Sequence, residues 1–269
     1  MIDVTFLGAS GYICKNLQLS ITDKYGLNFM SRSLSSHQIQ GYLKPSEIPF
    51  SNIIIDFSCR ADGYDVCTTE SLNSTFFRLA ENSSRCNYYF FVSTAAINIC
   101  RTLQIGYNNY IASKLALENM LSGLNTCKSI YSLRLPVVFG DRPKPFTVID
   151  VFYNKISGFR SRLRDPDSYI SAIHVSDLID SINVLRKDIE DNQYYDQSIV
   201  LASESILYNA GKLFDIVADQ YIQNRSLGIN CIAKQLAIFT SKLDLNDCRH
   251  ITVPDYSLPL KLLKWKPKH

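Results

Sequence analysis

Short apolar runs alternate with helix-length stretches through the first half of the chain. The runs predict buried strands at residues 2–7, 27–30, 53–57, 88–92 and 130–138. The stretches between them have helical periodicity and predict helices at residues 12–24, 63–81 and 108–124. Strands that alternate with helices are typical of βαβ units. The pattern therefore predicts an α/β fold with a doubly wound parallel sheet.

A glycine-containing turn follows the first predicted strand directly. Gly8, Ser10 and Gly11 separate that strand from a helix that begins near Tyr12 and Ile13. Glycine allows a tight turn and a close backbone approach to a pyrophosphate, and a helix N-terminus offers free N–H groups to it. The strand–turn–helix context predicts a dinucleotide-binding turn, with a plain structural turn as the alternative.

The end of the second predicted strand indicates which dinucleotide binds. Ser31, Arg32 and Ser33 stand where a carboxylate would otherwise bond the adenosine ribose. A guanidinium and two hydroxyls suit a 2′-phosphate instead. We therefore expect NADP(H) in preference to NAD(H); the alternative is that Arg32 is an ordinary loop arginine. We also assign Phe57 and Ser58, at the end of the third predicted strand, to the cofactor site.

Tyr110 and Lys114 lie four residues apart on the helix predicted at 108–124, so they share one helix face. A free phenol has a pKa of about 10, and a nearby ammonium favours its ionised form. Ser93 and Thr94 come directly after the preceding predicted strand, where a hydroxyl can bind a substrate carbonyl oxygen. The set predicts acid–base chemistry at a carbonyl. A surface pair on an amphipathic helix is the alternative for the tyrosine and lysine alone.

Four segments occur in order behind the glycine turn: VSTAAIN, YNNYIASKLALE, LRLPVVFG and AIHVSDL. Together they resemble the extended branch of the short-chain dehydrogenase/reductase family, which contains epimerases, dehydratases and 4-keto reductases of nucleotide-activated sugars. The resemblance implies a Rossmann-type fold. It implies Thr94, Tyr110 and Lys114 as the catalytic residues, with Ser93 beside them. It also implies residues that line the nicotinamide: Pro136, Val137 and Val138.

The chain departs from that family pattern in three places. Cys14 replaces the third glycine of the turn, which usually allows close packing of the helix on the strand. The interval between Thr94 and Tyr110 is short, so we expect a trimmed loop over the active site. The arginine that often precedes IHV is absent. We expect other arginines to bind a substrate diphosphate instead: Arg142, Arg160, Arg162 and Arg164. A solvated loop is the alternative for Arg160, Arg162 and Arg164.

Composition indicates which kinds of partner we do not expect. The net charge is +3 and no dense basic stripe occurs, so we expect no nucleic-acid partner. The eight cysteines form no CxxC pair and no zinc-like spacing, so we expect no metal site and a reducing compartment. No apolar run approaches the roughly 20 residues of a membrane helix. We expect a cytoplasmic protein that does not bind membranes.

The pattern changes near residue 140. Prolines interrupt the following segment, and helices are expected at residues 148–156, 175–186 and 210–220. We expect residues 1–140 to form the NADP(H)-binding core. Residues 141–269 would form a mainly substrate-binding part, with segments that return to the core.

Three functional hypotheses follow. The first is an NADPH-dependent reductase of a 4-keto nucleotide-activated deoxysugar, acting in the synthesis of cell-surface polysaccharide precursors. The second is a nucleotide-sugar epimerase that keeps NAD tightly bound. The third is a regulatory protein that binds NADP(H) without turnover. The family resemblance also implies a homodimer, built from the Tyr–Lys helix and the long helix before it.

Overall fold

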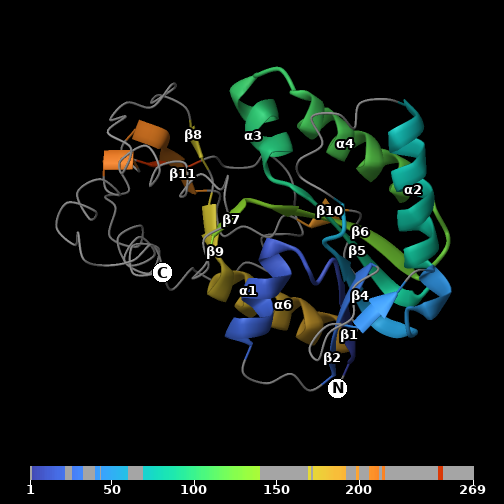
Figure 1. Cartoon of the computed structure of the whole chain (residues 1–269). Coiled ribbons are helices and arrows are strands. Elements are labelled where there is room, and N and C mark those ends of the chain that lie inside the picture. The colour runs from blue at the N-terminus through green and yellow to red at the C-terminus, as the bar shows by residue number, and fades with distance from the viewer. Residues whose placement is uncertain are drawn as a thin grey trace.

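The central feature is a seven-stranded parallel sheet (Figure 1). The computed structural model describes residues 2–21, 26–32, 40–42, 44–59, 69–139, 169–170, 172–191, 198–199, 206–211, 214–215 and 248–250. Within these ranges the strand order is β10-β6-β5-β4-β1-β2-β3. The strands are β1 (Val4–Leu7), β2 (Leu27–Arg32), β3 (Gln40–Tyr42), β4 (Ser51–Asp56), β5 (Cys86–Thr94), β6 (Ser129–Leu135) and β10 (Ser198–Ile199).

The strand order reverses direction at β1. The chain first adds β2 and β3 on one side of β1, and then adds β4, β5 and β6 on the other. All the pairings of this sheet are parallel. Such a reversal opens a crevice at the C-terminal ends of the two central strands, which is where doubly wound sheets bind ligands. The predicted α/β class is confirmed.

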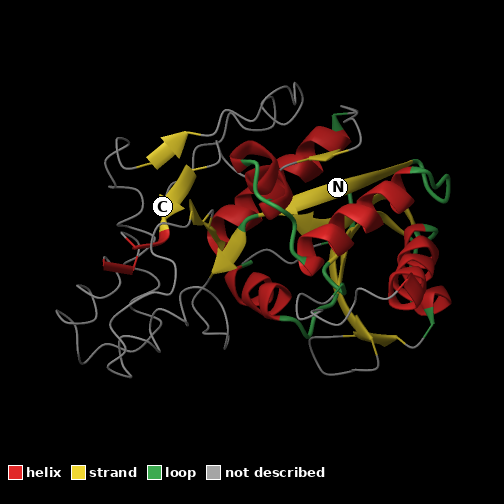
Figure 2. Cartoon of the chain, turned by 90° about the horizontal axis from the view of Figure 1, so that it is seen from above, coloured by secondary structure: helices red, strands yellow, loops and turns green. Residues whose placement is uncertain are grey.

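The central strands are apolar on both faces because helices cover both faces (Figure 2). Ile53 and Ile55 of β4 pack on the side of α1 (Tyr12–Ser20) and α6 (Val175–Glu190). Ile54 packs on the opposite side, under α2 (Thr69–Ser83) and α4 (Asn109–Ser122). Continuous apolar runs are what a strand buried on both faces requires.

Further short elements complete the described part. The 3-10 helix η1 (Pro45–Glu47) precedes β4, and α3 (Ala96–Leu103) lies between β5 and α4. Two smaller sheets lie outside the main one. Their strands are β7 (Val137–Phe139) with β9 (Ala172–His174), and β8 (Tyr169–Ile170), β11 (Ile206–Asn209) and β12 (Cys248–His250). None of the described helices has both the length and the hydropathy needed to span a bilayer.

Segments from beyond residue 140 contribute to the core. Helix α6 packs with α1, and β10 pairs with β6 at the edge of the main sheet. The helix predicted at 175–186 is confirmed as α6. The helix predicted at 148–156 lies outside the described residues, as does most of 210–220. The division of the chain at residue 140 stays a prediction.

One detail of the predicted elements is wrong. The single strand expected at 130–138 is two strands, because β6 ends at Leu135 and β7 begins at Val137 in another sheet. Pro136 stands between them and has no N–H to continue a ladder. The interval between Thr94 and Tyr110 contains the helix α3, which the sequence pattern did not predict, and the trimming of a loop there stays a prediction. The continuous apolar run gave no sign of the break between β6 and β7, and the short interval gave no sign of α3.

Gly8 ends β1 in a conformation that a side chain would disturb. Its φ is +86°, and a Cβ there would lie 2.8 Å from the Phe57 carbonyl carbon and 2.9 Å from the Ser58 nitrogen. We predict that Gly8→Ala lowers the free energy of unfolding by at least about 2 kcal/mol, measured by urea denaturation. Gly106→Ala is the control, because a Cβ at Gly106 meets nothing within 4 Å. A Gly8→Ala variant as stable as this control would contradict the strain argument.

Candidate functional site

The glycine turn joins the C-terminal end of β1 to the N-terminus of α1. The Ala9 N–H donates to the Met30 carbonyl at 2.9 Å, and the Gly11 N–H donates to the Gly8 carbonyl at 2.8 Å. Gly11 is the N-cap of α1, and no side chain caps this helix end. A helix N-terminus without a side-chain cap is a favourable place for an anionic ligand.

A cavity of about 490 Å³ opens beside this turn, which is within the usual size range of ligand pockets. It lies at the strand-order reversal and extends from β2 and β3 to α4. Its lining residues come from six parts of the chain: Gly8, Ser10, Gly11, Ser31, Arg32, Tyr42, Phe57, Ser58, Cys59, Thr75, Arg78, Tyr110, Ser113, Lys114 and Leu117. The Ser31 hydroxyl donates to the Ser10 hydroxyl at 2.8 Å and so links the end of β2 to the glycine turn.

Tyr110 and Lys114 both line this cavity from α4. The helix begins where Asn108 accepts a hydrogen bond from the Ile111 N–H at 2.9 Å. Such an N-cap fixes where the helix starts, and hence which face carries the two residues. The side chains lie one helical turn apart, as the spacing predicts.

The Lys114 ammonium is held deep in the structure. The side chain is only 4% exposed, and its Nζ donates to the Val92 carbonyl oxygen at 2.9 Å. The same Nζ lies 4.8 Å from the centre of the Phe91 ring and 5.9 Å from that of Tyr110. A buried ammonium with one hydrogen bond retains two further N–H donors for a ligand.

The hydroxyls predicted to complete the catalytic set do not line the cavity. Thr94 Oγ1 accepts a hydrogen bond from the Ala96 N–H at 3.3 Å, at the start of α3. Ser93 is buried, and its hydroxyl has no partner among the described residues. The structure thus brings Tyr110 and Lys114 together with the glycine turn but places Thr94 outside the cavity lining.

The other residues predicted for the cofactor and substrate sites divide into three groups. Gly8, Ser10, Gly11, Ser31, Arg32, Phe57 and Ser58 line the cavity. Five others do not: Tyr12, Ile13, Pro136, Val137 and Val138. The remaining predicted residues lie outside the described residues, and these are Ser33, Arg142, Arg160, Arg162 and Arg164.

Cys14 does not obstruct the cavity. Its side chain is fully buried in the core between the sheet and the α1–α6 layer, beside Leu17. Burial raises the pKa of the Cys14 thiol, and the charge of Asp56 raises it further, so the thiol stays neutral. A small neutral side chain therefore takes the place of the expected third glycine within the helix–sheet packing.

Asp56 is a buried carboxylate at the end of β4 whose importance the sequence did not reveal. It accepts hydrogen bonds from the Tyr89 hydroxyl at 2.6 Å, the Asn82 amide at 2.9 Å and the Ser58 N–H at 2.7 Å. Burial raises the pKa of Tyr89 well above its ordinary value, so its phenol remains a donor to Asp56. The network fixes the backbone of Ser58 at the cavity wall.

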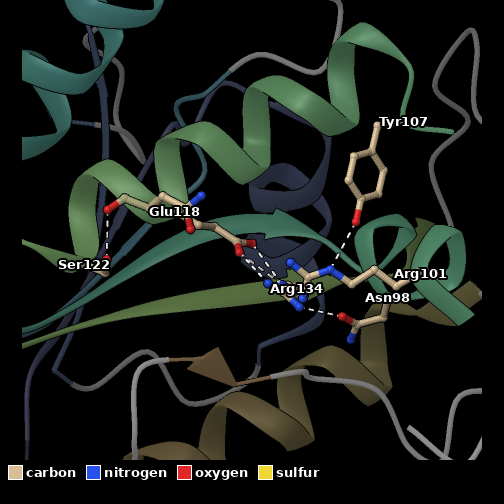
Figure 3. Close-up of polar contacts among 7 residues, drawn as sticks. Asn98, Arg101, Tyr107, Glu118, Ser122 and Arg134 are labelled. Atoms are coloured by element: carbon tan, nitrogen blue, oxygen red, sulfur yellow. Dashed lines mark hydrogen bonds and ion pairs between the residues drawn. The ribbon is translucent and has the colours of Figure 1, made fainter. Parts of the chain in front are cut away.

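A buried ion pair anchors the helix that carries Tyr110 and Lys114 (Figure 3). The Arg134 guanidinium on β6 donates to the Glu118 carboxylate on α4 at 2.6 Å and also bonds Asn98 on α3. Tyr110, Lys114 and Glu118 follow one another at intervals of one turn. The ion pair therefore holds the same helix face that presents the cavity residues.

Sequence reasoning missed several residues that line the cavity: Tyr42, Cys59, Thr75, Arg78, Ser113 and Leu117. The helical spacing from Tyr110 and Lys114 could have found Ser113 and Leu117. Arg78 on α2 and Tyr42 on β3 carried no such signal, because their place depends on how those elements pack. The Arg78 guanidinium donates to the Ser58 hydroxyl.

Comparison with known proteins agrees with the fold. No family model matches the sequence, and no curated protein matches it. Among solved structures, the NAD-dependent NDP-hexosamine 5,6-dehydratase TunA of tunicamycin biosynthesis has a TM-score of 0.61 and 12% identity, with 92% of this chain and 100% of that chain covered. The UDP-N-acetylglucosamine 4-epimerase from Bacillus cereus has a TM-score of 0.61 and 10% identity, with 89% and 99% covered.

A third similar structure is the Bordetella bronchiseptica enzyme WbmG in complex with NAD and UDP. It has a TM-score of 0.58 and 15% identity, with 81% of this chain and 77% of that chain covered. At these identities the likeness establishes the fold. The chain therefore has the fold of these solved structures, and the Rossmann-type fold that the resemblance implies is confirmed.

The anchoring role of the ion pair predicts a non-additive double-mutant cycle. Glu118→Leu leaves the Arg134 charge buried without its partner, and we predict a loss of about 3–5 kcal/mol in the free energy of unfolding. Combining Glu118→Leu with Arg134→Met removes both charges and recovers most of that loss. Urea denaturation measures the free energy of unfolding of the single and the double variant. Glu81→Gln is the control, because Glu81 is exposed. Equal losses in the single and double variants would refute the pairing.

Proposed function

We propose that this chain is an NADPH-dependent reductase that acts on the 4-keto group of a nucleotide-activated deoxysugar, in the synthesis of cell-surface polysaccharide precursors. The observation that carries the proposal is that Tyr110 and Lys114 share one cavity with the glycine turn and Arg32. The fold supports it, because the similar solved structures are of enzymes that modify nucleotide sugars.

The cavity residues fit a nicotinamide dinucleotide. The uncapped N-terminus of α1 can bind the pyrophosphate, and the missing side chain at Gly8 lets the backbone come close to it. NADPH supplies the hydride when it is bound. The Lys114 ammonium, with two N–H donors left after its bond to Val92, can bind ribose hydroxyls.

Tyr110 is the proposed acid. It lines the cavity within one turn of Lys114, so its hydroxyl can donate a proton to the substrate oxygen as that oxygen gains negative charge. The neighbouring ammonium stabilises the negative charge that is left on the phenol oxygen. Thr94 or Ser93 would bind the same substrate oxygen, as the family resemblance implies.

The preference for NADP(H) rests on charge at the end of β2. Arg32 lines the cavity at that position, and the adjacent Ser31 hydroxyl is bonded to Ser10. A guanidinium at this place attracts a 2′-phosphate, whereas a carboxylate would repel it.

A nucleotide-sugar epimerase is the second candidate. Two solved structures that share the fold are a UDP-galactose 4-epimerase and a UDP-N-acetylglucosamine 4-epimerase. An epimerase would retain NAD(H) through purification, because it re-reduces the sugar that it has oxidised. Identification of the nucleotide released by denaturing the purified protein separates the two candidates.

The decisive experiment follows the absorbance of reduced nicotinamide with a panel of 4-keto nucleotide sugars. We predict turnover with NADPH, and we predict that Tyr110→Phe slows it by at least about 100-fold. The dissociation constant of NADPH should change less than about threefold, because the phenol oxygen is proposed to act on the substrate. Tyr107→Phe is the matched control, since Tyr107 bonds Arg101 outside the cavity lining.

Two outcomes would redirect the assignment. A fully active Tyr110→Phe variant would show that the proposed acid is wrong. Tight NADPH binding with no Tyr110-dependent turnover across the panel would favour a regulatory protein that binds NADP(H).

We also propose a homodimer formed through α2 and α4, as the family resemblance implies. Phe77 on α2 is 63% exposed, so a partner packed on this helix would remove a large apolar side chain from water. We predict that the chain has the mass of a dimer by light scattering and that Phe77→Glu shifts it to the monomer. Phe50→Glu, which alters a comparably exposed residue before β4, should leave the mass unchanged. A monomeric wild-type chain would refute the proposal.

A further inference from the structure

Arg32 and Tyr42 present their side chains on the same face of the sheet. They are register partners on the neighbouring parallel strands β2 and β3, and residues in register point the same way. Tyr42 belongs to the apolar cluster on the α2–α4 side, together with Met30, which lies two residues before Arg32. Both side chains therefore point towards the layer that contains α2.

Arg78 approaches the same place from α2. Leu79 packs in the core beneath this helix, and Thr75 and Arg78 lie one turn apart on the stripe that lines the cavity. The guanidinium donates to the Ser58 hydroxyl and forms no ion pair with a carboxylate of the described residues. The nearby Asp56 accepts its hydrogen bonds from other groups, which are Tyr89, Asn82 and Ser58.

Tyr42 places a hydrogen-bond donor in the same part of the cavity as the two arginines. Its side chain is 4% exposed and lines the cavity, yet its hydroxyl has no well-formed partner among the described residues. Burial raises the pKa of Tyr42 to about 12, and Asp56 raises it as well, while Arg78, Arg32 and the Asn82 amide act in the opposite direction. The phenol therefore stays protonated at neutral pH. A buried hydroxyl without a partner is costly, so an acceptor that enters the cavity and binds it is stabilised.

These three groups lie at one end of the cavity. Arg32 ends β2, and Tyr42 is on the strand beyond β2, farther from the glycine turn, whereas Lys114 comes from α4. A dinucleotide that lays its pyrophosphate on the glycine turn and its nicotinamide near Tyr110 would direct its adenosine towards β2. If the dinucleotide is NADP(H), the anionic group on its adenosine is the 2′-phosphate, which is a phosphomonoester.

We propose that Arg78 and Tyr42 join Arg32 in a site for the 2′-phosphate of NADP(H), and that Arg78 is a determinant of cofactor choice. The identity of the dinucleotide rests on the function proposed above, but the phosphate site does not depend on any catalytic step. Two guanidiniums on opposite sides of a phosphate can each donate paired hydrogen bonds to it, and the neutral phenol supplies one more.

The test compares adenosine 2′,5′-bisphosphate with adenosine 5′-monophosphate, which differ only by the 2′-phosphate. Calorimetry on the full chain should show the bisphosphate binding at least about 10-fold more tightly. Arg78→Gln should weaken the bisphosphate by about 10- to 100-fold and leave the monophosphate within about twofold. Arg78→Lys should retain part of the affinity, and Tyr42→Phe should weaken the bisphosphate by about 3- to 10-fold. Lys187→Gln, which changes the same charge on the exposed end of α6, is the control.

The outcomes separate this inference from the proposed function. If Arg32→Gln weakens the bisphosphate but Arg78→Gln does not, the Arg78 site is refuted and the NADP(H) preference stands. If Arg78→Gln weakens both nucleotides equally, Arg78 acts only through Ser58 and the cavity wall, and the inference is again refuted. If the wild-type chain binds both nucleotides equally well, the NADP(H) preference itself is wrong. Circular dichroism of each variant verifies that it is folded.

Discussion

The backbone comes very close to itself just beyond the ends of β1 and β4, where a side chain at Gly8 would clash with the main chain of Phe57 and Ser58. There is room at this point for a hydrogen atom and for nothing larger. Because β1 and β4 are parallel neighbours, the glycine turn, the start of α1 and the end of β4 share one edge of the sheet. Gly8, Phe57 and Ser58 form one wall of the cavity.

The opposite wall depends on a second constraint, which fixes α4. Lys114 is bonded to the main chain of β5, and Glu118 is paired with Arg134 on β6, so successive turns of one helix face are attached to two adjacent strands. A buried charge tolerates little displacement from its partner, because the low dielectric makes an unpaired charge costly. The position of Tyr110, one turn earlier, follows from these attachments.

The cavity that these walls enclose has a different chemistry at each end. Near α4 it offers one phenol and one ammonium, a combination suited to moving a proton and binding hydroxyls. Near β2 and β3 it offers two guanidiniums and a neutral phenol, a combination suited to holding a phosphate. The buried Asp56 lies by the wall at the end of β4, and three hydrogen bonds satisfy its charge within the protein. A molecule with a phosphate at one end and a reactive ring at the other fits this arrangement.

The sequence by itself determined the α/β class, the glycine turn and the shared helix face of Tyr110 and Lys114, because each depends on local order or on helical period. It also placed Arg32 at the end of a strand. Only the tertiary structure decided that Arg78 and Tyr42 enter the cavity, since their directions follow from how α2 and β3 pack on the sheet. The same holds for Thr94, which the start of α3 draws into a local hydrogen bond. Local pattern fixes what an element is, whereas packing fixes which of its side chains meet.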